Sequence, residues 1–108
     1  MSIKRIYLAG PMNGHEKFNF PAFFAAAKQL RSEGYIVFSP AENDLLLYGQ
    51  DFLDHPERAS YKICMEDDTR WICRYADAIA LLPGWENSKG VKVEKALAEC
   101  LGLEIIYL

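Results

Sequence analysis

Two acidic residues of this chain occupy helix positions at which apolar side chains recur. Glu94 lies in a helix predicted over residues 90–101. Its arc of that helix also carries Val91, Val93 and Leu101. A buried carboxylate is costly unless it is used, and the positive end of the helix dipole favours its ionised form. The pattern therefore predicts a nucleophile or a base at Glu94, held ionised by the start of its helix.

The second acid, Asp68, lies in a long helix predicted over residues 56–76. Met65 precedes it by three residues and Ile72 follows it by four, so the three side chains share one face. Burial would raise the pKa of Asp68, which suits a general acid near neutral pH. A capped or salt-bridged core residue is the ordinary alternative for an inward acid of this kind.

Together the two acids have the properties that cleavage of a glycosidic bond requires. One carboxylate attacks or stabilises the anomeric carbon, while the other protonates the leaving group. Because a sequence does not give the distance between the two carboxylates, it indicates this chemistry without establishing it.

A loop after the first predicted strand could bind an anion. It contains Gly10, Pro11, Met12, Asn13 and Gly14. Its two glycines allow backbone amides to approach a phosphate closely, although an ordinary turn explains the same residues. The loop matches neither the P-loop nor the GxGxxG pattern, so neither an ATPase nor a dehydrogenase is favoured.

The loop before the last helix supplies three further candidates, Trp85, Ser88 and Gly90. Ser88 can cap the helix, and its hydroxyl together with the amides that follow can hold an anion at the helix N-terminus. Trp85 either stacks on a base or covers the end of the sheet.

These loops and acids are positioned by alternating strands and helices. Strands are predicted over residues 3–9, 35–39, 77–82 and 103–108. Helices are predicted from a cap at Asn19 to Gly34, over 56–76 and over 90–101, with a mobile loop and one helical turn between 41 and 55. This alternation predicts an α/β fold of the flavodoxin or Rossmann-like type, with about four parallel strands and helices on both faces. Ligands of such sheets bind at the carboxyl ends of the strands.

Composition limits the possible partners. The 108 residues are 51% hydrophobic, which suits one domain over residues 1–108 with a core of its own. A net charge of -3 without a basic run disfavours nucleic-acid polymers and anionic membranes as partners. Two histidines, His15 and His55, are too few for a zinc site, so no metal is expected. The three cysteines form no CxxC pair and are expected as reduced core thiols of a cytoplasmic protein.

Three motifs resemble one known group of enzymes. They are Tyr7-Leu8-Ala9-Gly10-Pro11-Met12, Asp68, and Ser88-x-Gly90-Val91-x-x-Glu94. In this order, over nearly the whole chain, they resemble the nucleoside 2-deoxyribosyltransferase superfamily, which includes the 2'-deoxynucleoside 5'-phosphate N-hydrolases. The stretch 76–86, which ends in Leu-Leu-Pro-Gly-Trp-Glu, is similar to small uncharacterised relatives in that group.

The resemblance implies a flavodoxin-like fold, scission of an N-glycosidic bond, and no organic cofactor. It implies that Glu94 attacks C1' of a deoxyribose, that Tyr7 orients this carboxylate, and that Asp68 helps to protonate the departing base. The loop that would line the sugar and the phosphate corresponds to Gly10, Met12 and Gly14.

The chain departs from the pattern at three places. Ser88 stands where the transferases usually have an aspartate and where the nucleotide hydrolases have a serine that contacts the 5'-phosphate. Asn13 stands in place of the arginine expected in the phosphate loop of those hydrolases. The middle helix is one residue longer before the next strand, which makes Asp67 an alternative to Asp68, although the helical wheel selects Asp68.

The leading prediction is hydrolysis of a deoxynucleoside 5'-monophosphate to free base and deoxyribose 5-phosphate. The alternatives are base exchange between deoxynucleosides, a non-catalytic nucleotide-binding module, and a protein whose acids are only structural. The expected partner is a small nucleoside or nucleotide. The resemblance also implies a homodimer or larger assembly, with which an apolar surplus is compatible. That surplus comprises Tyr48, Phe52, Trp71 and Trp85.

Overall fold

Four parallel strands form the centre of the molecule in the computed structural model, which describes residues 3–108. The strands are β1 (Arg5–Ala9), β2 (Ile36–Phe38), β3 (Ala78–Leu81) and β4 (Glu104–Tyr107). Their order in the sheet is β2-β1-β3-β4, and every neighbouring pair is parallel. The fold is therefore α/β of the flavodoxin-like type, as the alternation of elements predicts.

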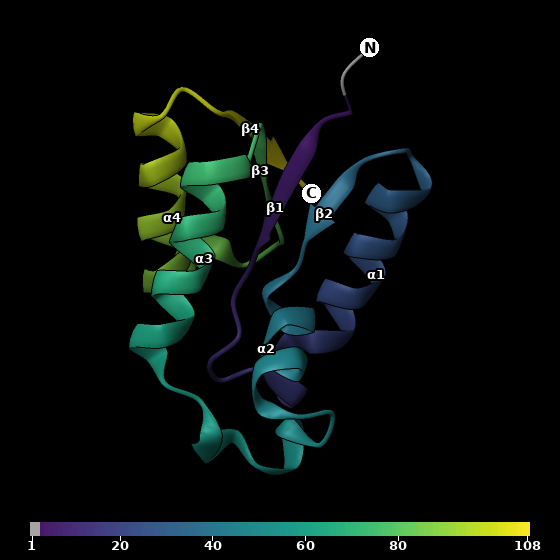
Figure 1. The fold of residues 1–108 in the computed structure, drawn as a ribbon, viewed down its shortest axis with the longest axis vertical. Helices are drawn as coiled ribbons and strands as arrows, with labels where there is room; N and C mark the ends of the chain where they lie inside the picture. The colour runs from purple at the N-terminus through teal and green to yellow at the C-terminus, as the bar shows by residue number, and fades with distance from the viewer. Residues whose placement is uncertain (1–2) are drawn as a thin grey trace.

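Helices cover both faces of this sheet. They are α1 (Phe20–Ser32), α2 (Pro40–Tyr48), α3 (Tyr61–Tyr75) and α4 (Lys89–Cys100). Short 3-10 helices occur at Glu16–Asn19, Phe52–Asp54, Pro56–Arg58 and Trp85–Asn87. Figure 1 shows α1 on one side of the sheet and α3 with α4 on the other. None of the helices described for residues 3–108 has the length and apolar character that a membrane crossing requires.

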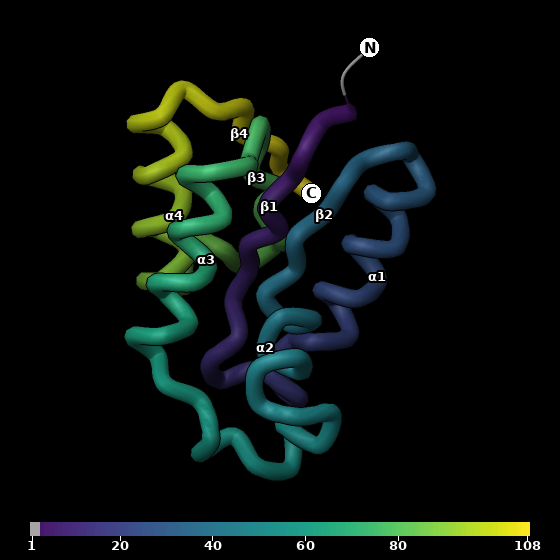
Figure 2. Tube along the Cα trace, in the orientation of Figure 1, coloured from purple at the N-terminus to yellow at the C-terminus, as the bar shows by residue number. Residues whose placement is uncertain are grey.

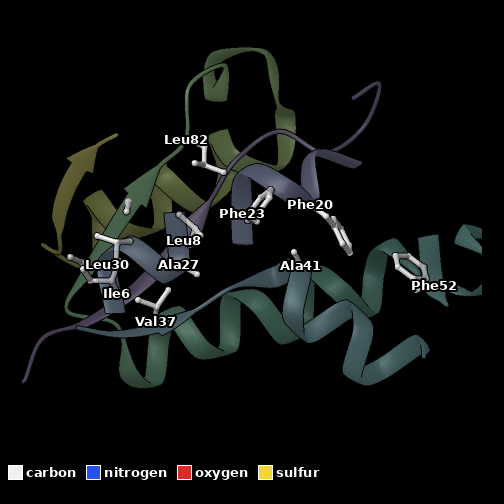
Figure 3. Close-up of a cluster of buried hydrophobic side chains, with 12 residues drawn as sticks. Ile6, Leu8, Phe20, Phe23, Ala27, Leu30, Val37, Ala41, Phe52 and Leu82 are labelled. Atoms are coloured by element: carbon white, nitrogen blue, oxygen red, sulfur yellow. The ribbon is translucent and has the colours of Figure 1, made fainter. Parts of the chain in front are cut away.

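The two faces of β1 belong to two separate parts of the core. Ile6 and Leu8 pack with Phe23 and Leu30 of α1 in one cluster, which Figure 3 draws in close-up. Tyr7 and the alternate residues of β1 and β3 pack instead with α3 and α4. Because successive side chains of a strand point to opposite faces, this alternation directs Tyr7 toward the helices that carry Asp68 and Glu94.

The order of the strands creates a switch point between β1 and β3. From β1 the chain crosses by α1 to β2, and it then returns by α3 to β3 on the other side of β1. Connections that leave in opposite directions open a crevice at the carboxyl ends of these two strands. Figure 2 shows the chain after β1 passing through this region, between α2 and the α3–α4 pair.

The prediction of a mobile loop with one helical turn over residues 41–55 is only partly right, because the helical part is longer than one turn. Residues Pro40–Tyr48 form helix α2, which begins with a proline that favours a first helical turn. The adjacent leucines Leu46 and Leu47 are exposed and obscure the helical period in the sequence. Conversely, α3 begins later than expected, because Ser60 caps it by accepting a hydrogen bond from the backbone amide of Ile63.

The predicted N-cap position at Asn19 is confirmed, but its side chain does not cap the helix. Asn19 precedes α1 in a left-handed conformation, at φ 62°, and makes no side-chain cap to the helix. Its side-chain amide instead donates to the carbonyl oxygen of Pro11 at 3.0 Å. This bond ties the loop after β1 to the start of α1, so the loop is held from both ends.

The residues taken as an apolar surplus pack within the chain. Phe52 is buried, and Tyr48, Trp71 and Trp85 are half-buried. The ring of Trp71, for example, stacks on Phe38 with centroids 5.1 Å apart. These four side chains therefore form no exposed patch, and the homodimer stays a prediction without their support.

The prediction of core thiols is wrong for two of the three cysteines. Cys73 and Cys100 are exposed, because each lies on the outer side of its helix, while Cys64 is half-buried. No group of metal-ligating side chains occurs within residues 3–108.

Candidate functional site

A pocket of about 400 Å³ opens at the carboxyl ends of β1 and β3. Tyr7, Asp68 and Glu94, predicted from three separate elements, all line it. The loop residues 10–13 and the helix-start residues Ser88 and Gly90 line it as well. The structure thus brings most of the predicted site residues together, although Gly14 and Trp85 are not part of the lining.

Tyr7 and Glu94 form a buried hydrogen-bonded pair at the base of the pocket. The Tyr7 hydroxyl donates to Oε2 of Glu94 at 2.6 Å. Glu94 is 5% exposed and Tyr7 is fully buried. A short bond to a carboxylate fixes its orientation, so one oxygen of Glu94 is held by Tyr7 while the other is left for a ligand.

The expectation that the helix start keeps Glu94 ionised needs correction. Ser88 is the N-cap of α4, so Glu94 is the sixth residue of the helix and lies in its second turn. The effect of the helix dipole falls off within the first turn. Burial therefore dominates and raises the pKa of Glu94 to about 7, against the lowering effect of the Tyr7 hydrogen bond. The predicted arc is also too wide, since Val93 and Leu101 are exposed.

Asp68 is the second buried acid, at 8% exposure on the inner face of α3. Burial, followed by the charges of Glu94 and Asp44, raises its pKa to about 8. Asp68 holds its proton to higher pH than Glu94, because the charges of Glu94 and Asp44 add to the effect of burial at Asp68. Near neutral pH the pair therefore consists of a protonated Asp68 and a Glu94 that is partly ionised.

The neighbouring Asp67 does not take part in this pair. Its side chain is 31% exposed and accepts a hydrogen bond from the Asn43 amide at 2.9 Å. Asp67 is absent from the pocket lining, whereas Asp68 borders it. Of the two candidates on α3, Asp68 is therefore the acid that faces the pocket, as the helical wheel predicts.

The start of α4 forms one side of the pocket. Ser88 caps the helix by accepting a hydrogen bond from the amide of Val91 at 3.3 Å, which confirms its predicted capping role. Lys89 lies over the ring of Tyr61, with its ammonium group 5.8 Å from the ring centroid. Lys89 also lines the pocket. A helix N-terminus with a nearby cation is suited to an anionic group.

Sequence reasoning missed the α2 side of the pocket. Asp44 of α2, Cys64 of α3 and the phenylalanine ring of Phe52 all line it. One signal was present, because Ala41, Asp44 and Tyr48 recur at helical spacing. The exposed leucines between them hid this pattern, so a third buried acid went unpredicted.

Trp85 lies at the end of the sheet. Its ring packs near Tyr107 of β4, with centroids 6.0 Å apart, and under the ammonium group of Lys95 at 5.3 Å. Of the two roles considered for this residue, this position corresponds to covering the sheet end.

Two glycines of the pocket differ in how closely they are packed. A Cβ on Gly10 would lie 2.8 Å from Cβ and 2.7 Å from Cδ1 of Leu82, a buried core residue. A Cβ on Gly90 would meet the hydroxyl of Tyr61 at 2.9 Å, and Tyr61 is 53% exposed. The first contact is with rigid core and the second with the end of a movable side chain.

Gly10→Ala is therefore expected to lower the free energy of unfolding by about 1–3 kcal/mol. Gly90→Ala, the matched control, is expected to stay within about 1 kcal/mol of the native protein, because Tyr61 can rotate away and alanine favours helix. Urea unfolding of the three proteins measures both values. Equal stabilities of the two variants would contradict this reading of the packing.

The fold and the pocket define the class of protein as a flavodoxin-like α/β domain with a ligand pocket at the switch point, built around buried acids. Comparison with protein families then assigns the chain more closely. It belongs to the family described as "Domain of unknown function (DUF4406)", whose model matches residues 4–107. None of the curated proteins matches the chain significantly.

Proposed function

We propose that this protein cleaves the N-glycosidic bond of a deoxynucleoside 5'-monophosphate, releasing the free base and deoxyribose 5-phosphate. The observation that carries the proposal is the buried Tyr7–Glu94 hydrogen bond of 2.6 Å, in a pocket that the buried Asp68 also lines. The resemblance to the nucleoside 2-deoxyribosyltransferase superfamily supports it at the same three residues.

In the first step, an ionised Glu94 attacks C1' of the deoxyribose. The bond between C1' and the base nitrogen breaks, and its electron pair stays on the base. Asp68 donates its proton to the departing base, which leaves a carboxylate on α3. Tyr7 holds Oε2 of Glu94 throughout, so that the other oxygen forms the bond to C1'.

In the second step, water resolves the bond between Glu94 and C1'. The Asp68 carboxylate accepts a proton from the water, whose oxygen bonds to C1' as the Glu94 carboxylate leaves. The product is deoxyribose 5-phosphate, and Asp68 regains the proton that it lost in the first step. The two acids thus return to their starting states after each turnover.

A 5'-phosphate is supported by the chemistry of the α4 side of the pocket. The N-terminus of α4, the Ser88 hydroxyl, and the charge of Lys89 are suited to a phosphate group. Asn13 in the loop after β1 also lines the pocket but adds no positive charge there. The volume of about 400 Å³ lies within the range of small-molecule sites.

A product screen tests the proposal. Each of the common deoxynucleosides and deoxynucleoside 5'-monophosphates is incubated with the protein, with and without an added free base, and products are separated by chromatography. We expect free base and deoxyribose 5-phosphate, with monophosphates cleaved about tenfold or more faster than nucleosides.

The other outcomes of the screen point to different functions. A new nucleoside or nucleotide formed with the added base would indicate base exchange in place of hydrolysis. Binding of nucleotides without any product would indicate a non-catalytic binding module, and the proposed function would then be wrong.

A further inference from the structure

Asp44 is a buried acid that the proposed reaction does not use. It lies in the middle of α2, is 8% exposed and borders the pocket. Within residues 3–108, its one hydrogen-bond donor is the thiol of Cys64, whose Sγ lies 3.7 Å from Oδ1. No salt bridge to Asp44 occurs in the same part of the chain. A buried carboxylate with so little compensation is costly, unless a ligand supplies donors.

Asp44 contacts α3 one helical turn before Asp68. Cys64, which touches Asp44, is four residues before Asp68 on the same side of α3, a separation of about 6 Å along the helix. The bond from Asn43 to Asp67 holds α2 against α3 at the next position. The charges of both Glu94 and Asp44 raise the pKa of Asp68, consistent with a place between them.

These groups, which line one pocket, can be matched to the parts of a nucleotide. The start of α4 is suited to the phosphate, Glu94 to the sugar carbon, and Asp68 to the leaving nitrogen of the base. Asp44 then lies where the rest of the base would be. The same side of the pocket carries aromatic rings, since Phe18 and Phe52, stacked with centroids 6.3 Å apart, both line it.

We propose that the Asp44 carboxylate recognises the nucleobase. The pocket would thereby select bases that carry an exocyclic amino group over those with an oxo group in its place. The inference rests on the proposed function for the orientation of the nucleotide. An ionised carboxylate only accepts hydrogen bonds, so it pairs with the amino group of cytosine, adenine or guanine. The carbonyl oxygen that replaces the amino group in uracil or hypoxanthine would face the carboxylate with a second acceptor.

The state of the two side chains agrees with this role. Burial raises the pKa of Asp44 to about 6, so its carboxylate is mostly ionised at pH 7.5. Burial also raises the pKa of the Cys64 thiol to about 11, which keeps it protonated as a donor to Oδ1. Oδ2 is then left as the acceptor for an amino group.

Two matched pairs of nucleotides test the proposal, dCMP with dUMP and dAMP with dIMP. Within each pair the exocyclic amino group becomes an oxo group, and the adjacent ring nitrogen changes from an acceptor to an N–H donor. Dissociation constants by calorimetry and initial rates by chromatography are measured for each. We expect the native protein to favour the amino member by about tenfold or more. Asp44→Asn, which replaces one acceptor with a donor, is expected to remove or reverse this preference.

Glu42→Gln serves as the matched control. Glu42 is on the same helix, pairs with Arg31 at the surface and does not line the pocket. We expect it to keep the preference of the native protein. If circular dichroism shows that Asp44→Asn does not fold, the proposal is judged from the native protein alone. Equal or reversed affinities for the amino and oxo members of each pair then overturn it.

The two readouts separate this inference from the proposed function. If the native protein cleaves the nucleotides and Asp44→Asn leaves the preference for the amino over the oxo member unchanged, then recognition of the base by Asp44 is overturned. N-glycosidic cleavage is then unaffected. Amino-selective binding that Asp44→Asn removes, without turnover by the native protein, supports recognition of the base by Asp44 and overturns cleavage. Absence of both binding and turnover for all four nucleotides overturns both.

Discussion

Glu94→Gln is expected to lower kcat for nucleotide cleavage by about 10³-fold or more, since removal of a covalent nucleophile costs at least this much in other enzymes. Glutamine has nearly the same shape as glutamate, and its carbonyl oxygen can still accept the 2.6 Å hydrogen bond from Tyr7. The variant is therefore expected to fold and to bind the nucleotide. Steady-state kinetics and calorimetry measure the two properties separately.

Glu99→Gln is the matched control for this prediction. Glu99 is exposed on α4, five residues further along, and pairs with Lys95 at 3.0 Å. Loss of an exposed pair costs little stability, so activity should remain within about twofold of the native value. Native activity in a folded Glu94→Gln variant would contradict the nucleophilic role and would favour an acid that is only structural.

The free energy of unfolding is expected to fall as the pH rises from about 4 to about 8. Burial raises the pKa of Glu94 to about 7 and of Asp68 to about 8, both above the values of about 4 in the unfolded chain. Between these limits the folded state binds more protons than the unfolded state, which makes the slope of stability against pH negative. The stability conferred by the protonated acids is complete near pH 4 and is lost progressively up to about pH 8.

The loss should be large for a domain of this size. Each unit of pKa shift corresponds to about 1.4 kcal/mol, so two shifts of several units each are comparable to the whole stability of a small domain. Urea unfolding at several pH values from 5 to 8 measures the slope. The double variant Asp68→Asn/Glu94→Gln should have a much flatter slope and higher stability at pH 8 than the native protein.

Asp67→Asn provides the control for the pH dependence, because Asp67 is half-exposed beside Asp68 and outside the pocket. Its slope should follow that of the native protein. Parallel slopes for the native protein and the double variant would show that the buried acids are not the source of the effect.

The fold could be predicted from the sequence wherever the hydrophobic residues followed a single period, either that of a strand or that of a helix. The apolar strands and the amphipathic helices α1, α3 and α4 were predicted to within a few residues at most of their ends. Helix α2 was not, because Leu46 and Leu47 are apolar residues on a solvent-facing side. Hydrophobic periodicity assumes that such residues face the core, and here they do not.

The candidate site was predicted in part for a similar reason. Glu94 and Asp68 interrupt apolar faces, so each is visible in its own helix as a polar residue in an apolar position. Asp44 belongs to the helix that was missed. Its burial comes from the packing of α2 against α3, which the helical spacing of Ala41, Asp44 and Tyr48 does not reveal by itself. The ionisation of Glu94 was misjudged because burial depends on the whole fold, whereas the helix dipole can be inferred locally.

The hydrogen bond between Tyr7 and Glu94 also determines when, during synthesis of the chain, the site can form. Its partners are 87 positions apart, one in the first strand and the other in the last helix. As the chain leaves the ribosome, β1, α1, β2 and α2 emerge well before α4, so the pair cannot form until nearly all of the chain is available. Until then Tyr7 lacks its acceptor and Glu94 remains in water, where its charge costs nothing. The electrostatic penalty of burying Glu94 thus arises only when α4 packs against the sheet.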